Sequence, residues 1–249
     1  MAQVPTLALM NGVRIPQLGF GTYKLGENAQ RIVESALEVG YRHLDGAQMY
    51  LNEAEVGRAI RSSGLPRDQL FLTSKLDNPN HNPDAAKWSL DKTLSDLGTD
   101  HLDLFLIHWP LPMYYGGDLG RTWRAMEDFY EQGLARSIGV SNFESHHLEL
   151  VEQTASVAPM VNQVESHPYS QIAHCTASTK VWESLPRPGL HSAEGAPQAT
   201  PCWRPSARST ERAPHKSLCA GDCNVATSCS LSLLPVKARW RTWTCLTFP

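Results

Sequence analysis

Four residues in the first half of the chain have side chains that together could donate a proton: Asp45, Tyr50, Lys75 and His108. A tyrosine hydroxyl has a pKa near ~10 in water and is by itself a poor acid at neutral pH. A nearby lysine cation favours the phenolate and lowers that pKa, and a carboxylate can hold the lysine in place. A histidine can donate a hydrogen bond that orients the accepting oxygen. The four types indicate protonation of a carbonyl group while hydride is delivered to it.

Each of these residues lies at or near the end of a predicted strand. Short apolar runs predict six strands, at Leu18–Thr22, Arg42–Gly46, Leu70–Leu76, Leu102–His108, Ser137–Ser141 and Val161–Glu165. A hairpin is predicted before them, because Met10-Asn11-Gly12 has the Asn-Gly preference of a tight turn and lies between Leu7–Leu9 and Val13–Ile15.

Stretches with helical spacing separate the strands. Three of them end at a glycine suited to the C′ position: Arg31–Val39 at Gly40, Glu53–Ser63 at Gly64 and Asp84–Leu97 at Gly98. Strands that alternate with helices imply a parallel sheet with crossover helices. Because few residues remain between the units, the α/β pattern favours a closed (β/α) barrel of the TIM type over two separate domains.

The bulk properties exclude several classes of partner. The 249 residues carry a net charge of −3, which gives no reason to expect a nucleic-acid or membrane-surface partner. The first residues contain no basic stretch followed by an apolar run, and no apolar segment approaches the ~20 residues of a membrane span. We therefore expect a cytoplasmic monomer.

The composition changes from about Gln171. Only four acidic residues follow, against nine Lys and Arg, and eight of the 17 prolines and all six cysteines lie in this part. It has no sustained period of 3.6 or 2 and is typical of disordered or frame-shifted sequence. The sequence thus predicts two parts, six βα units over 1–170 and an atypical tail over 171–249.

Four potential soft metal ligands lie close together in the tail: His215, Cys219, Cys223 and Cys229. Their spacing lacks the Cys-x2-Cys knuckle usual in structural zinc sites. We therefore expect no metal site.

Several motifs, taken in order, resemble the aldo-keto reductase family over about residues 5–169, with the bacterial-type, diketogulonate-reducing members most similar. They are Leu18–Thr22, Gly40–Asp45, Tyr50 with Asn52-Glu53, Ser74–Leu76, Leu106–Pro110, Ile138–Asn142 and Val161–Glu165. The resemblance implies a (β/α)8 barrel that binds NADPH without a Rossmann motif. In agreement, Gly19-Phe20-Gly21 is too short to form a G-x-G-x-x-G fingerprint.

The resemblance also implies roles for individual residues. Tyr50 would be the proton donor, Lys75 would lower its pKa and Asp45 would pair with Lys75. His108 would orient the substrate carbonyl, with Trp109 beside it in the substrate site.

A further set would bind the cofactor: Gly21, Thr22, Asp45, Ser141, Asn142 and Gln163. Ser141, Asn142 and Gln163 would hydrogen-bond the nicotinamide carboxamide. Thr22 would lie close to the cofactor.

Taken singly, the same residues allow plainer interpretations. Asp45 could be a turn or helix cap, Tyr50 a packing residue and His108 a core histidine with satisfied hydrogen bonds. Ser141 and Asn142 could cap a helix predicted over Glu144–Thr154.

Four positions depart from the family pattern: Gly46, Leu51, Asp77 and Ser166. Gly46 stands where Thr is common, Leu51 where Gly is usual and Ser166 where Leu is common. Asp77 stands where an aromatic residue often lines the substrate pocket. These changes bear on substrate preference and local packing more than on the chemistry.

Strands seven and eight of the barrel are not recognisable in the tail. Lys180–Pro186 resembles the first of them only faintly, and Leu234–Lys237 resembles the second more faintly still. An incomplete barrel would leave strands one and six with unpaired edges and would lack the grip on the cofactor phosphates. We therefore expect weak or absent NADPH binding and poor solubility. A frameshift or an alternative exon is the hypothesis that explains such a tail.

The expected function is NADPH-dependent reduction of a small aldehyde or ketone to an alcohol. Two alternatives stay open. One is a catalytically impaired, truncated or frame-shifted reductase, and the other is a non-catalytic binding module on the same scaffold.

Overall fold

The structure is a computed structural model, and it describes residues 4–111, 113, 116–165, 228–231 and 244–248. Several predicted features lie outside these residues: Ser166, the two segments that faintly resemble strands seven and eight, and three of the four tail ligands (His215, Cys219 and Cys223). The division of the chain at about residue 170 stays a prediction.

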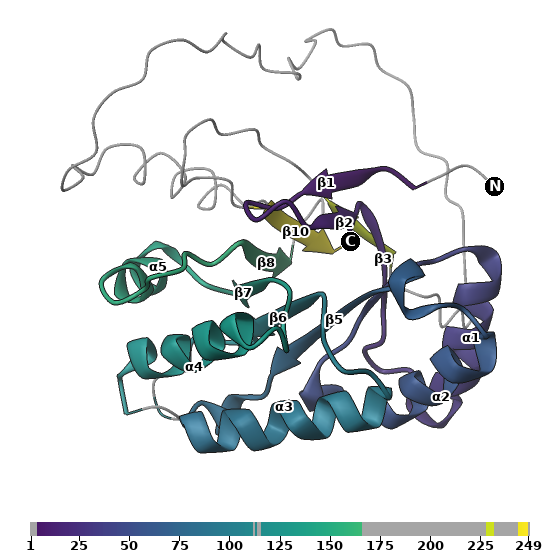
Figure 1. Cartoon of the computed structure of the whole chain (residues 1–249), viewed down its shortest axis with the longest axis horizontal. Helices are drawn as coiled ribbons and strands as arrows, with labels where there is room; N and C mark the ends of the chain where they lie inside the picture. Colours follow the sequence, from purple (N-terminus) through teal and green to yellow (C-terminus); the bar gives the residue numbers. More distant parts are fainter. Residues whose placement is uncertain (1–3, 112, 114–115, 166–227, 232–243, 249) are drawn as a thin grey trace, which may run out of the picture. The chain divides into compact units, whose positions relative to one another are not determined.

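Six parallel strands form the centre of the fold (Figure 1). They are β3 Leu18–Gly21, β4 His43–Asp45, β5 Phe71–Leu76, β6 Leu104–Ile107, β7 Ile138–Ser141 and β8 Val161–Glu165. Each pairs in parallel with the next along the chain, with registers such as Asp45 opposite Thr73 and Lys75 opposite Leu106. The six predicted strands are confirmed, with ends that shift by one or two residues.

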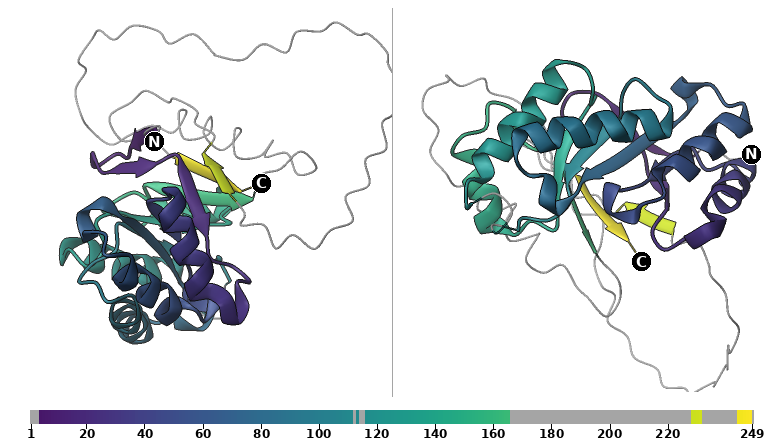
Figure 2. Two further views of the ribbon diagram at one scale, coloured as in Figure 1. Left: turned by 90° about the vertical axis from the view of Figure 1, so that its right-hand side faces the viewer. Right: turned by 90° about the horizontal axis from the view of Figure 1, so that it is seen from below.

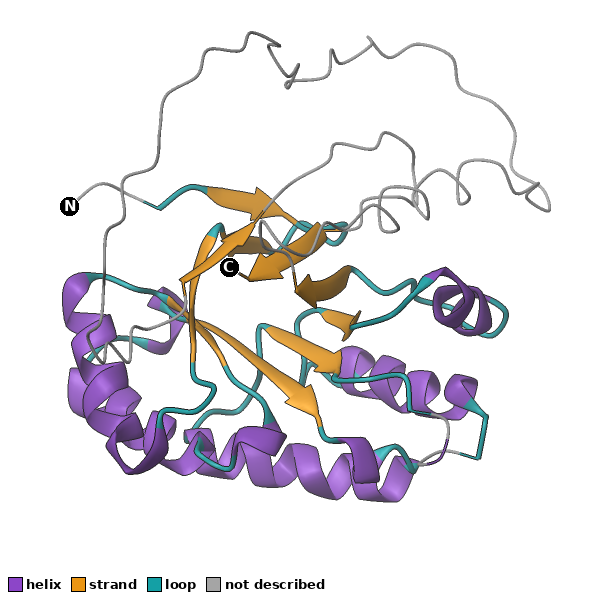
Figure 3. Ribbon diagram, turned by 180° about the vertical axis from the view of Figure 1, so that it is seen from behind, coloured by secondary structure: helices purple, strands orange, loops and turns teal. Residues whose placement is uncertain are grey.

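Five α-helices lie on the outer side of these strands, as Figure 3 shows. They are α1 Ala29–Val39, α2 Glu53–Ser63, α3 Pro83–Leu97, α4 Leu119–Glu131 and α5 Ser145–Glu152. Gly98 ends α3 with a φ of +70°, and its N–H donates to the carbonyls of Leu94 and Ser95, as the C′ position requires. Buried apolar side chains fill the space between strands and helices, among them Phe20, Leu72, Phe105, Trp123 and Val140.

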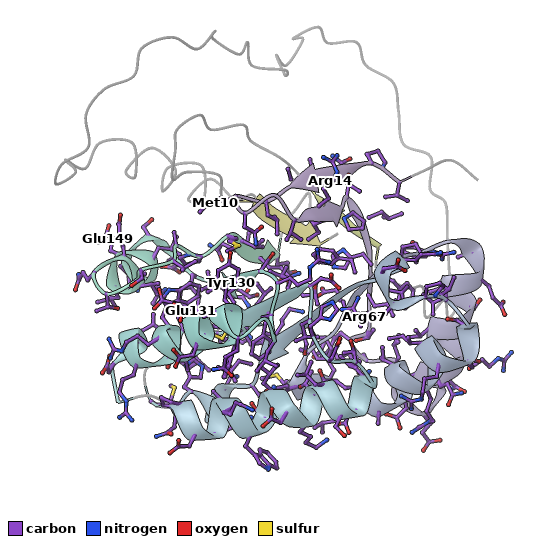
Figure 4. All side chains as sticks on the ribbon, viewed as in Figure 1. Met10, Arg14, Arg67, Tyr130, Glu131 and Glu149 are labelled. Carbon is purple, nitrogen blue, oxygen red and sulfur yellow. The ribbon has the colours of Figure 1, made fainter. Side chains whose placement is uncertain are left out.

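The predicted hairpin is present before the barrel strands. It consists of β1 Thr6–Ala8 and β2 Arg14–Pro16, one residue away from the predicted positions. Figure 4 labels Met10 at its turn and Arg14 on β2. The turn is tied to the barrel because the Asn11 side-chain amide donates to the carbonyl of Arg136 over 2.7 Å.

Two short strands from the tail close the ring, β9 Ser228–Leu231 and β10 Thr244–Phe248 (Figure 2). β10 pairs in parallel with β8, whereas β9 runs antiparallel to both β10 and β3. The expectation of unpaired edges on the first and sixth barrel strands is therefore wrong. Strand pairing uses backbone N–H and C=O groups, so a segment without the family's side-chain pattern can still cover an open edge.

The fold class predicted from the sequence is confirmed. The described residues form an α/β fold, with five βα units and a sixth parallel strand of an incomplete (β/α)8 barrel. The antiparallel direction of β9 departs from a repeating βα barrel, in which all eight strands run parallel. Among the described residues no helix follows β8, β9 or β10.

An ionic cluster around Asp103 stabilises the barrel at the start of β6. The buried Asp103 carboxylate lies 2.7 Å from Arg67 Nη2 and 3.1 Å from Arg136 Nη1, and it accepts the backbone N–H of Leu72. Figure 4 labels Arg67. Removing one partner of a buried pair leaves the other charges uncompensated, although both arginines here keep contact with water.

We expect Asp103→Asn to lower the free energy of unfolding by roughly 2 kcal/mol, less than the ~3–5 kcal/mol typical of a fully buried pair. Urea denaturation measures the change. The matched control is Asp91→Asn, which removes an exposed pair with Lys87 and should cost less than about 0.5 kcal/mol. Equal losses in the two variants would contradict the assignment.

Candidate active site

The four predicted proton-transfer residues lie together at the carboxyl ends of the strands. Lys75 Nζ is 2.7 Å from Asp45 Oδ1 and donates to the carbonyl of Gly46 over 2.9 Å. It lies 5.3 Å from the centre of the Tyr50 ring, and the Tyr50 and His108 rings are 5.8 Å apart. The carboxyl end of the strands is where barrel enzymes place their sites.

The Asp45–Lys75 pair is buried, with exposed fractions of 2% and 1%. Asp45 is the last residue of β4, and Lys75 lies within β5. Because Asp45 lies inside a strand and pairs with a lysine, its interpretation as a turn or helix cap is wrong. A buried lysine with a carboxylate partner keeps its charge where water is scarce.

Tyr50 ends a one-turn 3-10 helix, η2 Gln48–Tyr50. The next residue, Leu51, has a φ of +56° and is 88% exposed. That backbone conformation suits glycine better than a bulky residue, which gives a physical reason for the glycine usual at this position. Asn52 attaches this segment to the barrel, since its side-chain amide donates to the carbonyl of Thr22, just after β3, over 2.7 Å.

His108 follows β6 and is buried beside Lys75. Burial, and then the Lys75 cation, lowers the pKa of His108 from 6.5 to about 3, so the ring is neutral at physiological pH. Its Nδ1 has no hydrogen-bond partner among the described residues. The interpretation of His108 as a core histidine with satisfied hydrogen bonds is therefore wrong.

Buried neutral histidines make stability depend on pH. Burial is the main cause that lowers the pKa of His43 and His81 to about 4 and of His108 to about 3, from 6.5. As the pH falls, the unfolded chain takes up protons near 6.5, before the folded chain does. Stability present above about pH 6.5 is therefore lost progressively as the pH falls towards about 3 to 4.

We expect the urea midpoint to fall between about pH 7.5 and about pH 5. The variant His108→Gln should reduce this dependence, whereas His146→Gln, which changes an exposed ring, should leave it unchanged. A dependence that is the same in all three proteins would contradict this explanation.

The predicted carboxamide-binding residues adjoin the same cluster. Ser141 Oγ donates to the carbonyl of Gln163 over 2.9 Å, and Asn142 Nδ2 donates to the carbonyl of His108 over 3.1 Å. Gln163 Nε2 donates to Asp45 Oδ2 over 3.2 Å. The helix-cap interpretation of Ser141 and Asn142 is wrong, because Glu144 is the N-cap of α5.

The remaining predicted residues surround this cluster. Gly21 ends β3, and Thr22 is fully buried with its hydroxyl donating to the carbonyl of Asp45 over 3.3 Å. The Trp109 ring is stacked 6.5 Å from the His108 ring and is half-exposed. Asp77 caps its own turn by accepting the N–H of Asn78, so its side chain is held by the backbone.

Sequence reasoning missed Tyr23. Its ring lies 4.9 Å from the Tyr50 ring and is 58% exposed, beside the site. The available signal was its place directly after Gly21-Thr22, at the carboxyl end of a strand.

The described residues contain no group of three or more His, Cys, Asp or Glu that could hold a metal ion. Cys229 lies on β9, and the other three predicted tail ligands fall outside the part of the chain that is described. In that same part, none of the helices has the length and apolar character needed to cross a membrane.

Comparison with known proteins gives matches over about two-thirds of the chain. The model of the Aldo/keto reductase family matches residues 17–181. A glyoxal reductase of Bacillus subtilis is 45% identical over 165 residues, which cover 66% of this chain and 58% of the relative. An aldo-keto reductase of Mycolicibacterium smegmatis is 44% identical over 165 residues, covering 66% and 59%. The chain thus spans just under three-fifths of the length of these relatives.

Solved structures agree with these matches. An aldo-keto reductase of Bombyx mori in complex with NADP superposes with a TM-score of 0.68 at 33% identity, covering 73% of this chain and 64% of that one. An aldo/keto reductase from Brucella melitensis gives 0.67 at 40% identity, covering 72% and 70%.

Proposed function

The chain belongs to the aldo/keto reductase family, and we propose that it reduces a small aldehyde or ketone to an alcohol with NADPH, using Tyr50 as the proton donor. The observation that carries the proposal is the buried Asp45–Lys75 pair beside the Tyr50 ring, with the neutral His108 ring 5.8 Å from that of Tyr50. This arrangement supports Tyr50 as the group that protonates a carbonyl oxygen.

Residues at the carboxyl end of β7, together with Gln163 within β8, fit a nicotinamide carboxamide. Ser141 offers a hydroxyl, and Asn142 and Gln163 offer side-chain amides that can both donate and accept. The similar silkworm reductase was solved with NADP, which supports the choice of cofactor. Bound NADPH would supply the hydride. The segment that holds the 2′-phosphate in the family is not recognisable in the sequence.

Each side chain of the candidate site then has its own role in the proton transfer. His108 is neutral, and a neutral imidazole N–H is too weak an acid to donate its proton, so its part is to hydrogen-bond and orient the carbonyl oxygen. The Tyr50 hydroxyl gives its proton to that oxygen. The Lys75 ammonium stabilises the phenolate that remains, and Asp45 holds the ammonium in place.

The substrate class is a small carbonyl compound. The relatives named for glyoxal and for D/L-glyceraldehyde support this choice, because both compounds are small aldehydes. Oxidation of NADPH by the purified chain, followed with a panel of small aldehydes and ketones, tests the proposal. Turnover that requires both NADPH and a carbonyl compound would support it, and no turnover with any of them would contradict it.

A catalytically impaired form of the same enzyme is the second candidate. It is favoured by strand β9, whose antiparallel direction departs from the all-parallel order of a βα barrel. Fluorescence titration with NADPH separates the two. Weak or absent binding, as the sequence predicts, would support the impaired form, whereas micromolar affinity would contradict it.

A further inference from the structure

A buried polar cluster joins the elements that carry Tyr50 and Lys75. It consists of Gln48 on η2, Glu53 on α2, Ser74 on β5 and Thr93 on α3. Glu53, Ser74 and Thr93 are buried, and Gln48 is partly buried. We propose that Glu53 is a positioning residue that holds the turn bearing Tyr50 against the strand bearing Lys75; the catalytic part of this inference rests on the proposed function.

The hydrogen bonds of the cluster follow one order. Glu53 Oε1 accepts from Ser74 Oγ over 2.6 Å, and Glu53 Oε2 accepts from Thr93 Oγ1 over 2.9 Å. Thr93 Oγ1 in turn accepts from Gln48 Nε2 over 3.1 Å. Both hydroxyl protons thus point to the Glu53 carboxylate, which accepts only.

Each end of this chain of hydrogen bonds adjoins a residue of the candidate site. Ser74 directly precedes Lys75 on β5, and Gln48 belongs to the same single turn as Tyr50. Gln48 Oε1 also accepts the backbone N–H of Asp77 over 2.9 Å, just after β5 ends. The turn is therefore tied to β5 at two points, directly through Gln48 and indirectly through Glu53.

A close helix contact brings Glu53 and Thr93 together. At Gly57, one turn after Glu53, α2 lies so near α3 that an added Cβ would be 2.1 Å from the carbonyl oxygen of Asp96. Thr93 precedes Asp96 on the same helix by about one turn. Because only glycine fits at this contact, the backbone itself holds the carboxylate and the Thr93 hydroxyl at hydrogen-bond distance.

The position of Glu53 carries a cost in stability. It is 8% exposed, and burial raises its pKa, although the hydrogen bonds from Ser74 and Thr93 act in the opposite direction. Both of these donors are neutral hydroxyl groups, and Lys92 on the same helix as Thr93 pairs instead with Asp96. A buried carboxylate held by hydroxyl groups is costly, and such costs are typical of functional sites.

The variant Glu53→Gln tests the proposal with nearly the same side-chain shape. The amide nitrogen cannot accept, so one of the two hydroxyl protons loses its acceptor. We expect amide hydrogen exchange at Tyr50 and Leu51, whose N–H groups close the turn, to become about tenfold faster relative to exchange in the rest of the protein. In the active chain, kcat should fall about tenfold with an unchanged Kd for NADPH.

The matched control is Glu34→Gln. Glu34 lies on α1, and its carboxylate also accepts two side-chain hydrogen bonds, from Ser62 Oγ at 2.6 Å and from Gln30 Nε2 at 2.9 Å. It should change neither the exchange at Tyr50 and Leu51 nor kcat. Exchange that is equal in the two variants, or that rises evenly across the protein, would overturn the proposal.

Two further arms keep the test decisive. If Glu53→Gln does not fold, Thr93→Val removes only the hydroxyl on α3 and should give the same local exchange, and unchanged exchange at Tyr50 would overturn the proposal. If the wild-type chain reduces no carbonyl compound, the proposed function fails, but the exchange measurement still decides whether Glu53 holds the turn.

Discussion

Replacing Tyr50 with phenylalanine is expected to lower kcat for carbonyl reduction by about 10²–10⁴-fold, the usual contribution of a positioned acid. The phenylalanine ring can keep the contacts with Tyr23 and His108, whose rings lie 4.9 and 5.8 Å from that of Tyr50. What is lost is the hydroxyl proton. His108 cannot replace it, because its lowered pKa keeps the ring neutral.

Initial rates of NADPH oxidation measure this effect, and NADPH fluorescence reports cofactor binding separately. We expect the Kd for NADPH to stay the same, since the hydroxyl acts on the substrate oxygen. Tyr130→Phe is the matched control, because Tyr130 lies on α4, outside the candidate site (Figure 4). Comparable rates in Tyr50→Phe and the wild type would show that another group donates the proton.

The sequence predicts the six barrel strands and the proximity of the candidate site residues well, for identifiable physical reasons. A barrel strand that is buried on both faces has a short, continuous apolar sequence, as in Leu104–Ile107. A helix can end at a glycine in the C′ position, such as Gly98. Side chains at the carboxyl ends of such strands must meet, so the positions of Asp45, Lys75 and His108 in the sequence already predict that they lie near one another.

Other features could not be predicted, because they depend on contacts between distant residues. The hydroxyls of Ser74 and Thr93 give no signal in the sequence, yet both donate to Glu53, 21 and 40 residues away. The closing strands β9 and β10 have no family pattern in the sequence, yet they pair with β3 and β8. Local side-chain patterns therefore define the six parallel strands, whereas the closure of the ring is a long-range property.

The variant Lys75→Met is expected to lose both stability and activity. It leaves the Asp45 carboxylate buried without its cation, with Gln163 Nε2 as the remaining side-chain donor to Oδ2. Breaking a buried pair from one side costs about 3–5 kcal/mol, which is a large part of the ~5–15 kcal/mol stability of a typical domain. Urea denaturation should show this loss, whereas Lys87→Met, which breaks an exposed pair, should cost under about 1 kcal/mol.

The double variant Asp45→Asn with Lys75→Met separates the structural part of this pair from its chemical part. Removing both charges leaves no unpaired ion in the interior, so most of the lost stability should return, and the two changes should be strongly non-additive. Turnover should stay absent, because no cation then stabilises the Tyr50 phenolate. Recovery of both stability and turnover would show that the pair is only structural. Recovery of stability alone would show that the buried ammonium is needed for the proton transfer itself.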